Sequence, residues 1–409
     1  MKLRCLMLGI WLSLAMVPVL KAQQPEALQP VAEAARQVLL SLGMEAVRVV
    51  QTDSVCTVAY EDNVFRGTYR GLAVVIRALR DLPETEQAAT YELVTLKEGI
   101  PRLLLTLPRQ ESALEVSYDT DAAMRRLRGS KQENRMAGRI DVVLYPELFL
   151  QNSWLDKLYG VAVYFSPAIE MNLWKGAVLT GQVILPLYTN MTDDKKYIRP
   201  GVITLRQEFR LPGGFLGQFT AGNFTGNRMG VDAVLRYQSA NGRWGVGANA
   251  GLTGSSTCYG GEWVVSKWKR VTGSVWGRYN EPRYGLEIDL AAIRLVYGDM
   301  GGRLDIRRHF GEVTVGVYGM VTDGEMNGGF RFALPVPGTK RPKRRAVRFC
   351  LPEYFGYEYR ARHGYAYGEK LLGYSYEVRP DRNDSRGYDA PGFVKREVLQ
   401  FLLYKSFIN

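Results

Sequence analysis

The chain has 409 residues and a formal net charge of +12, from 53 Lys and Arg against 41 Asp and Glu. Its 43 Gly, 24 Tyr, 15 Phe and 7 Trp favour a strand-rich fold, because aromatic residues are enriched in strands and Gly in turns. Beyond the N-terminus no stretch approaches the ~18 consecutive apolar residues of a membrane helix, which excludes a helical membrane protein. Only two histidines, His309 and His363, are present, which excludes a metal site built on three or more of them.

The first 22 residues predict a cleaved signal peptide. Lys2 and Arg4 precede an apolar run over residues 6–20, and Ala22 stands before a polar stretch. A retained anchor is the alternative, but the run is short for a span of ~20 residues. Cleavage leaves a net charge of about +9, which attracts acidic partners, and secretion excludes nucleic acid as a partner in practice.

Residues 23–135 predict a small periplasmic α/β domain that ends in a basic linker. Apolar residues recur at three- and four-residue steps in residues 28–42 and 68–82, which predicts two amphipathic helices. Strands are predicted at 46–50, 55–60, 91–96 and 102–107. The segment 122–139 is polar and basic, and it predicts a linker or a short exposed helix.

Residues 136–409 predict a transmembrane antiparallel β-barrel of about fourteen strands. The clearest strand places Trp244, Val246 and Leu252 on one face and Asn249 on the other, and Asn241-Gly242 before it is a hairpin signal. Such strands turn their apolar face to lipid and their polar face to a lumen, and closure is expected because lipid cannot hydrogen-bond a sheet edge. A large soluble β-sandwich or propeller is the alternative. The predicted strands are 158–174, 178–188, 202–211, 215–224, 229–237, 244–253, 263–279, 284–297, 303–310, 313–321, 328–335, 346–359, 363–378 and 398–407.

Charged residues alternate with apolar ones along several of these strands. On a barrel they point inward, because Arg or Lys at mid-bilayer on the lipid face costs ~2–4 kcal/mol. The candidate lumen and glycan-contacting residues are Arg206, Glu208, Arg210, Arg303, Asp305 and Arg307. Two interpretations stay open: a self-neutralising network that fixes strand register, or a lining that screens an acidic polymer.

The densest basic run lies among prolines and predicts a loop. It comprises Lys340, Arg341, Lys343, Arg344 and Arg345. Such a loop suits contact with lipopolysaccharide phosphates or an acidic glycan, although solvated loops often look the same.

No motif indicates catalysis or a cofactor. His309 ends a predicted strand, and neither Ser266 nor Ser274 is tied to a histidine by spacing, as a barrel lipase would require. We therefore expect a protein that is not an enzyme and binds no cofactor. Cys258 and Cys350 are compatible with a disulfide or with two free thiols.

The stretch from residue 221 to 332 resembles the YjbH/GfcD family of outer-membrane β-barrel proteins. The motifs that carry the resemblance are Leu235-Arg236-Tyr237, Trp244 to Ala248, Val271-Thr272-Gly273, Tyr297-Gly298-Asp299, Arg307-Arg308-His309-Phe310 and Thr322-Asp323. This resemblance implies a role in exopolysaccharide or capsule export. The chain departs from the family in being shorter and in lacking a lipid-anchor Cys.

These observations predict an outer-membrane protein that assists export or assembly of a surface polysaccharide, with the N-terminal domain in the periplasm. The expected partners are outer-membrane lipid, lipopolysaccharide, an anionic polysaccharide and other envelope export proteins. A structural or docking component of an outer-membrane secretion machine is the alternative.

Overall fold

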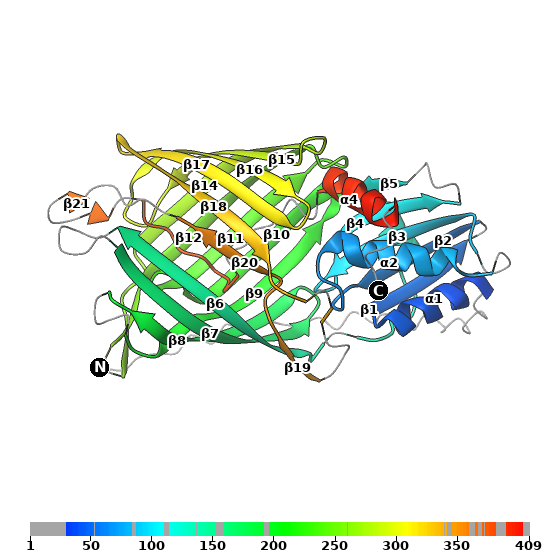
Figure 1. The fold of residues 1–409 in the computed structure, drawn as a ribbon, viewed down its shortest axis with the longest axis horizontal. Helices are drawn as coiled ribbons and strands as arrows, with labels where there is room; N and C mark the ends of the chain where they lie inside the picture. Colours follow the sequence, from blue (N-terminus) through cyan, green and yellow to red (C-terminus); the bar gives the residue numbers. More distant parts are fainter. Residues whose placement is uncertain are drawn as a thin grey trace, which may run out of the picture.

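The computed structural model describes residues 30–403 apart from short internal gaps, and it has two connected parts (Figure 1). The gaps are residues 53, 84–86, 110–113, 136, 153–158, 192–195, 260, 339, 342–345, 360–364, 367–369, 372 and 382–389. The predicted signal peptide lies outside the described residues. No helix within the described ranges is long and apolar enough to cross a membrane.

The N-terminal part is a five-stranded sheet with helices on both faces. Its elements are α1 (Pro30–Leu42), β1 (Glu45–Thr52), β2 (Val55–Glu61), α2 (Thr68–Arg80), β3 (Thr90–Lys97), β4 (Ile100–Pro108), β5 (Glu115–Ser117) and α3 (Asp121–Arg126). In α2, Leu72, Ile76 and Leu79 recur on one face and are fully buried with α1 against the sheet. The predicted helices and strands of this region are confirmed. α3 covers the opposite face with Ala123, so part of the predicted basic linker is packed.

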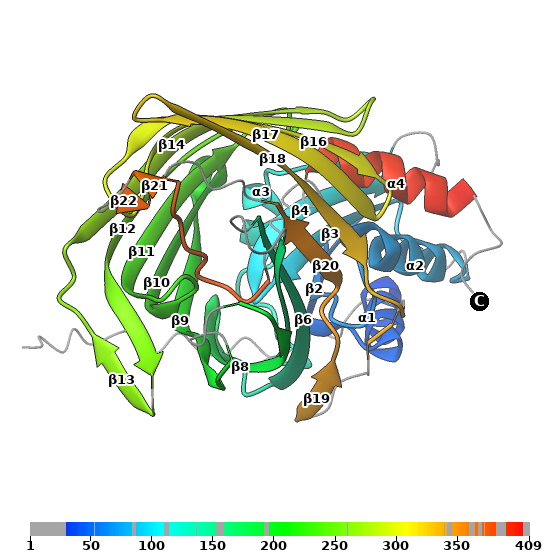
Figure 2. The same cartoon turned by 60° about the vertical axis from the view of Figure 1, so that its left-hand side comes forward.

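The second part is one strongly curved, almost wholly antiparallel sheet of 15 strands (Figures 1 and 2). Most strands pair with their neighbours in sequence, as a meander does. The strands are β6 (Ile140–Asn152), β7 (Tyr159–Trp174), β8 (Ala177–Thr189), β9 (Arg199–Leu211), β10 (Phe215–Phe224), β11 (Arg228–Gln238), β12 (Trp244–Tyr259), β13 (Glu262–Val265), β14 (Arg270–Glu281), β15 (Leu286–Arg294), β16 (Met300–Phe310), β17 (Val313–Thr322), β18 (Glu325–Pro335), β19 (Val347–Cys350) and β20 (Tyr354–Glu358). A mainly β fold with a large sheet is therefore confirmed.

The hydrogen-bonded ladder does not close into a ring within the described residues. β19 pairs in parallel with β6 at one edge, and β20 pairs with β18 at the other. Residues 351–353 link β19 to β20, so the chain itself joins the two edges. The closed barrel is therefore not found as a continuous ladder.

The predicted final strand at 398–407 is wrong over the residues that the structure describes. Pro391–Leu403 form helix α4, and residues 404–407 lie outside the described part. Val394, Val398 and Phe401 recur at helical spacing, and the two valines are fully buried in the core of the N-terminal sheet. Residues 398–403 are six apolar or amide side chains in a row, a pattern that fits the period of a strand as well as that of a helix. The segment forms a helix because it packs against the apolar surface beside α2.

Three other predicted strands differ in the structure. The segment 263–279 divides into β13 and β14, and 346–359 divides into β19 and β20. Among its described residues, the segment 363–378 holds the short hairpin β21 (Tyr365–Ala366) and β22 (Lys370–Leu371) and no other strand. Residues 373–381 then run without regular structure, and we name them the strap.

Candidate functional site: the charged interior

Alternation along the strands places apolar side chains on the convex face and charges on the concave face. On β16, Leu304 and Ile306 are exposed, while Asp305 and Arg307 are buried and line an interior cavity of about 510 Å³. Trp244 is likewise exposed. We name this cavity the interior chamber. Its lining carries nearly equal numbers of basic and acidic side chains.

One ion-pair network crosses β16, β18 and β20 inside the chamber. The Arg303 guanidinium donates to both Asp305 carboxylate oxygens, at 2.7 and 2.9 Å. Arg331 pairs with Asp305 at 2.5 Å and with Glu358 at 3.1 Å. Each charge in this group is therefore compensated by a neighbour.

A second network crosses β14, β15 and β16. Arg278 donates to both oxygens of Asp289 at 2.6 Å, and Arg307 lies 2.5 Å from Glu287. His309 Nε2 is 3.5 Å from Glu287, and its Nδ1 is 3.0 Å from the Thr314 hydroxyl. This geometry favours the interpretation of a self-neutralising network that fixes strand register.

A third network joins the sheet to the N-terminal domain and contains the candidate residues Arg206 and Glu208. Arg102 on β4 donates to both carboxylate oxygens of Glu208 on β9, at 2.6 and 2.8 Å. Arg206 donates to both oxygens of Glu98, in the turn between β3 and β4, at 2.8 and 2.5 Å. All four side chains are largely buried, so two reciprocal bidentate pairs fasten the domain to the sheet.

The Glu98 carboxylate shows the strength of this fastening. Burial disfavours its charged form, but the attraction of Arg206 outweighs that cost and lowers the pKa of Glu98 to about 2. Because the folded pKa lies below the unfolded value, this stabilisation is present above pH ~4.5 and is lost as the pH falls towards 2.

Arg210 also contacts the domain. Its guanidinium donates to the Pro101 carbonyl at 3.2 Å and lies 4.5 Å from the centroid of the Tyr118 ring. The Tyr118 N–H donates to the Ala240 carbonyl at 2.7 Å, in the turn between β11 and β12. Arg206, Glu208 and Arg210 therefore contact the domain, which covers one end of the chamber (Figure 1).

The strap lies within the curve of the sheet (Figure 2). The Tyr376 hydroxyl donates to Asp232 at 3.0 Å, and Arg379 donates to Gln218 at 2.6 Å. The Val296 N–H donates to the Tyr374 carbonyl at 3.1 Å. Sequence reasoning assigned this segment to a strand, because the alternation of tyrosines with polar residues looks the same in an extended strap.

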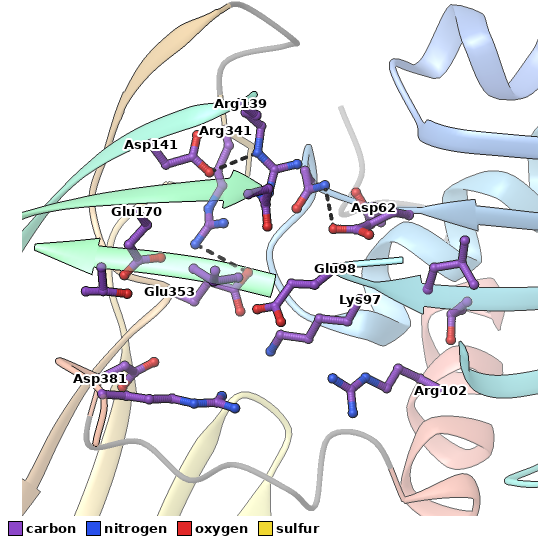
Figure 3. Close-up of a pocket in the computed structure, with 18 of the residues that line it drawn as sticks. Asp62, Lys97, Glu98, Arg102, Arg139, Asp141, Glu170, Arg341, Glu353 and Asp381 are labelled. Carbon is purple, nitrogen blue, oxygen red and sulfur yellow. Dashed lines mark hydrogen bonds and ion pairs between the residues drawn. The ribbon is translucent and has the colours of Figure 1, made fainter. Parts of the chain in front are cut away.

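A smaller cavity of about 240 Å³ lies between the domain and the sheet, and both parts line it with charges (Figure 3). Arg139 donates to Asp141 at 3.1 Å. Asp62 accepts the N–H groups of Val64 and Phe65, each at 2.9 Å. Burial raises the pKa of Asp62 to about 7, and the negative charge of Glu353 adds to the rise.

The raised pKa of Asp62 predicts a stability that falls with rising pH. The folded protein binds more protons than the unfolded chain between pH ~4 and ~7, so unfolding becomes easier over that interval by about 2–4 kcal/mol. Asp62→Asn is expected to remove this dependence, and Asp81→Asn, at an exposed helix end, is the matched control. Denaturant unfolding of the purified protein at pH 5 and pH 8 measures the difference. An unchanged pH dependence in Asp62→Asn would contradict it.

The described part of the predicted basic loop contacts the N-terminal domain. Lys340 forms an isolated bridge with Phe65, and the Arg341 N–H donates to the Val64 carbonyl at 2.6 Å. The Arg341 guanidinium lies 3.5 Å from Glu353. Lys343, Arg344 and Arg345 lie outside the described residues.

The other candidates for catalysis or metal binding are the histidines and cysteines. The His309 ring packs 5.1 Å from Phe393 of α4, and His363 lies outside the described residues. Cys56, Cys258 and Cys350 are free thiols. Among the described residues, no group of three or more His, Cys, Asp or Glu side chains could hold a metal ion.

The fold and site define a mainly β protein whose large curved sheet encloses a charge-balanced chamber and carries an α/β domain at one end. No family model, curated protein or solved structure matches the chain. The resemblance to the YjbH/GfcD family therefore stays a prediction.

Proposed function

We propose that this protein is an outer-membrane β-barrel of the YjbH/GfcD type that assists export or assembly of a surface exopolysaccharide or capsule without catalysing a covalent step. The observation that carries the proposal is the combination of an apolar convex face with a charged concave face. A lipid-facing wall and a polar interior have this distribution.

The convex face has the composition of a membrane belt. Val275, Leu290 and Val317 are 65%, 64% and 56% exposed near the middle of their strands. Exposed aromatic side chains lie at the ends of strands nearest the N-terminal domain or α4, namely Trp174, Phe215, Trp244, Tyr284 and Phe310. Aromatic girdles mark the interface on membrane barrels, whereas soluble monomers rarely expose a continuous apolar surface of this extent.

The turns support a periplasmic place for the N-terminal domain. The turn between β7 and β8 spans residues 175–176, and the turn between β16 and β17 spans 311–312. Both contact the domain, through Gly176 with Glu98 and through Glu312 with Arg66. Short turns are typical of the periplasmic end of such barrels. The longest connection between strands that are consecutive in the chain and paired in the sheet, between β8 and β9, lies at the opposite end, where residues 323–324 also make a short turn.

The partly occupied interior argues against a permanently open pore. The domain covers one end and the strap lies in the chamber, so passage of a glycan requires a rearrangement. The same observation favours the second candidate function, a structural or docking component of a secretion machine.

Deletion of the gene in its native host tests the proposal. We expect the protein in the outer-membrane fraction, and loss of surface polysaccharide in the deletion strain with protein secretion unchanged. Restored polysaccharide on complementation completes the test. Lost secretion with intact polysaccharide would favour the docking role, and a soluble periplasmic protein would contradict both.

A further inference from the structure

The strap holds a tyrosine against the inner wall through contacts that resemble those of a bound sugar. The Tyr376 hydroxyl lies 3.0 Å from Asp232 and 3.0 Å from the Thr272 hydroxyl. Its ring stacks on Phe224, with centroids 5.2 Å apart and planes inclined by 12°. Asn249 donates to the same Asp232 oxygen at 2.8 Å.

We infer that the inner wall around Asp232 is a binding site for neutral sugar residues of a glycan chain, and that the strap occupies this site in the closed state. The inference rests on the proposed function and names its substrate class. A sugar ring presents hydroxyl groups at its edge and C–H groups on its face. Asp232, Asn249 and Thr272 match the edge, and the buried Phe224 ring matches the face.

The electrostatics of the wall favour a neutral sugar over an acidic one. Asp232 lies 4% exposed at the centre of the site, where it repels a uronate carboxylate. Two of the arginines that line the chamber, Arg278 and Arg303, are each bound in a bidentate pair by an aspartate. An acidic sugar would have to displace those pairs to reach these two arginines, whereas a hydroxyl-rich neutral one need not.

The strap is fastened at Tyr374 and Glu377 by polar contacts that are able to exchange. The Thr225 N–H donates to the Glu377 carbonyl at 3.0 Å, and the Glu377 N–H donates to the Thr225 hydroxyl at 2.8 Å. The Tyr374 hydroxyl donates to the Gly226 carbonyl at 2.6 Å. By contrast, α4 buries whole valine side chains in the domain core, so the strap is the easier of the two segments to displace.

A reversible disulfide tests the inference, because the oxidised and reduced forms of one variant are compared. Thr225→Cys and Glu377→Cys, in a Cys258→Ser background, join two residues whose backbones are already linked by one hydrogen bond. The full-length protein in detergent micelles is titrated calorimetrically with maltohexaose as the neutral probe and with a hexagalacturonate as the acidic probe. We expect the reduced protein to bind maltohexaose and its affinity for maltohexaose to fall at least tenfold on oxidation. We expect the reduced protein to bind the hexagalacturonate at least fivefold more weakly than it binds maltohexaose.

Two single variants refine the test. Tyr376→Phe removes the hydroxyl that competes for Asp232 and is expected to tighten maltohexaose binding at least fivefold. Tyr279→Phe loses a comparable hydroxyl–carboxylate bond, to Glu281 at 2.9 Å, away from the strap and is expected to leave affinity unchanged. Asp232→Ala in the Tyr376→Phe background is expected to abolish binding.

Thermal unfolding of each variant establishes that it is folded. Equal affinity of the oxidised and reduced forms, or absence of maltohexaose binding in folded Tyr376→Phe, would overturn the inference, and tighter binding of the acidic probe would overturn the sugar class. The titration in micelles tests the sugar site, and the deletion strain tests the proposed function. Because the two experiments are independent, a failure of one proposal can be told apart from a failure of the other.

Discussion

Replacing Glu208 with Ala is expected to lower the free energy of unfolding by about 3–5 kcal/mol and to loosen the α/β domain from the sheet. The Glu208 side chain is 2% exposed and lies 2.6 Å from Arg102, 3.4 Å from Arg206 and 3.4 Å from Arg236. Its removal leaves Arg102 buried without its carboxylate, and a buried uncompensated charge costs far more than the pair contributes.

Denaturant unfolding in micelles measures the loss, and limited proteolysis reports loosening of the domain. Glu33→Ala is the matched control, because Glu33 pairs with Arg36 on the surface of α1 and exposed pairs contribute about 0–1 kcal/mol. Arg102→Ala with Glu208→Ala removes both charges and is expected to recover part of the lost stability. Equal losses for Glu208→Ala and Glu33→Ala would show that the network does not fasten the domain.

Most strands of the large sheet and the direction of their charges were predictable from local pattern. Alternation fixes which side chains share a face, so Trp244 and Leu304 point outward while Asp305 and Arg307 point inward. The helix α2 was equally predictable, because Leu72, Ile76 and Leu79 repeat with the period of a helix.

The partners of the inward charges were not predictable, because they come from a separate part of the chain. Arg102 and Glu208 are 106 residues apart, and nothing local to either residue indicates the other. The helix α4 escaped prediction for a related reason: the apolar run at Val398 suits a strand or a helix, and only the surface presented by α2 decides. The strap was assigned to a strand because a polar segment lining a chamber alternates as a strand does.

The structure joins the domain, α4 and the sheet at one end. Arg77 of α2 donates to the Phe401 carbonyl of α4 at 2.6 Å, while Arg396 of α4 donates to the Pro282 carbonyl between β14 and β15 at 2.7 Å. α4 therefore bridges the domain and the wall, and opening of that end requires several buried contacts to break. The strap is held by hydrogen bonds and ring contacts and contributes none of its described residues to the apolar core of the domain, which makes its displacement the more accessible rearrangement.

Leu290→Arg is expected to destabilise the membrane-inserted protein by about 2–4 kcal/mol, the cost of a cation at mid-bilayer on a lipid-facing strand. Leu290 is 64% exposed near the middle of β15, on the convex face. In a soluble protein the same change at so exposed a position would alter stability by no more than about 0.5 kcal/mol. The variant therefore separates a lipid-facing wall from a water-facing one, and reversible urea unfolding in liposomes measures it.

Tyr284→Arg is the matched control, since Tyr284 is 59% exposed in the turn that precedes β15, at the level of the proposed aromatic girdle. There the cost of an arginine falls to about 0–1 kcal/mol, because its guanidinium reaches the headgroups. A lipid-facing wall thus predicts a difference between the two variants that depends on depth. Equal and small effects at both positions would mean that water covers the convex face, and the outer-membrane proposal would then be wrong.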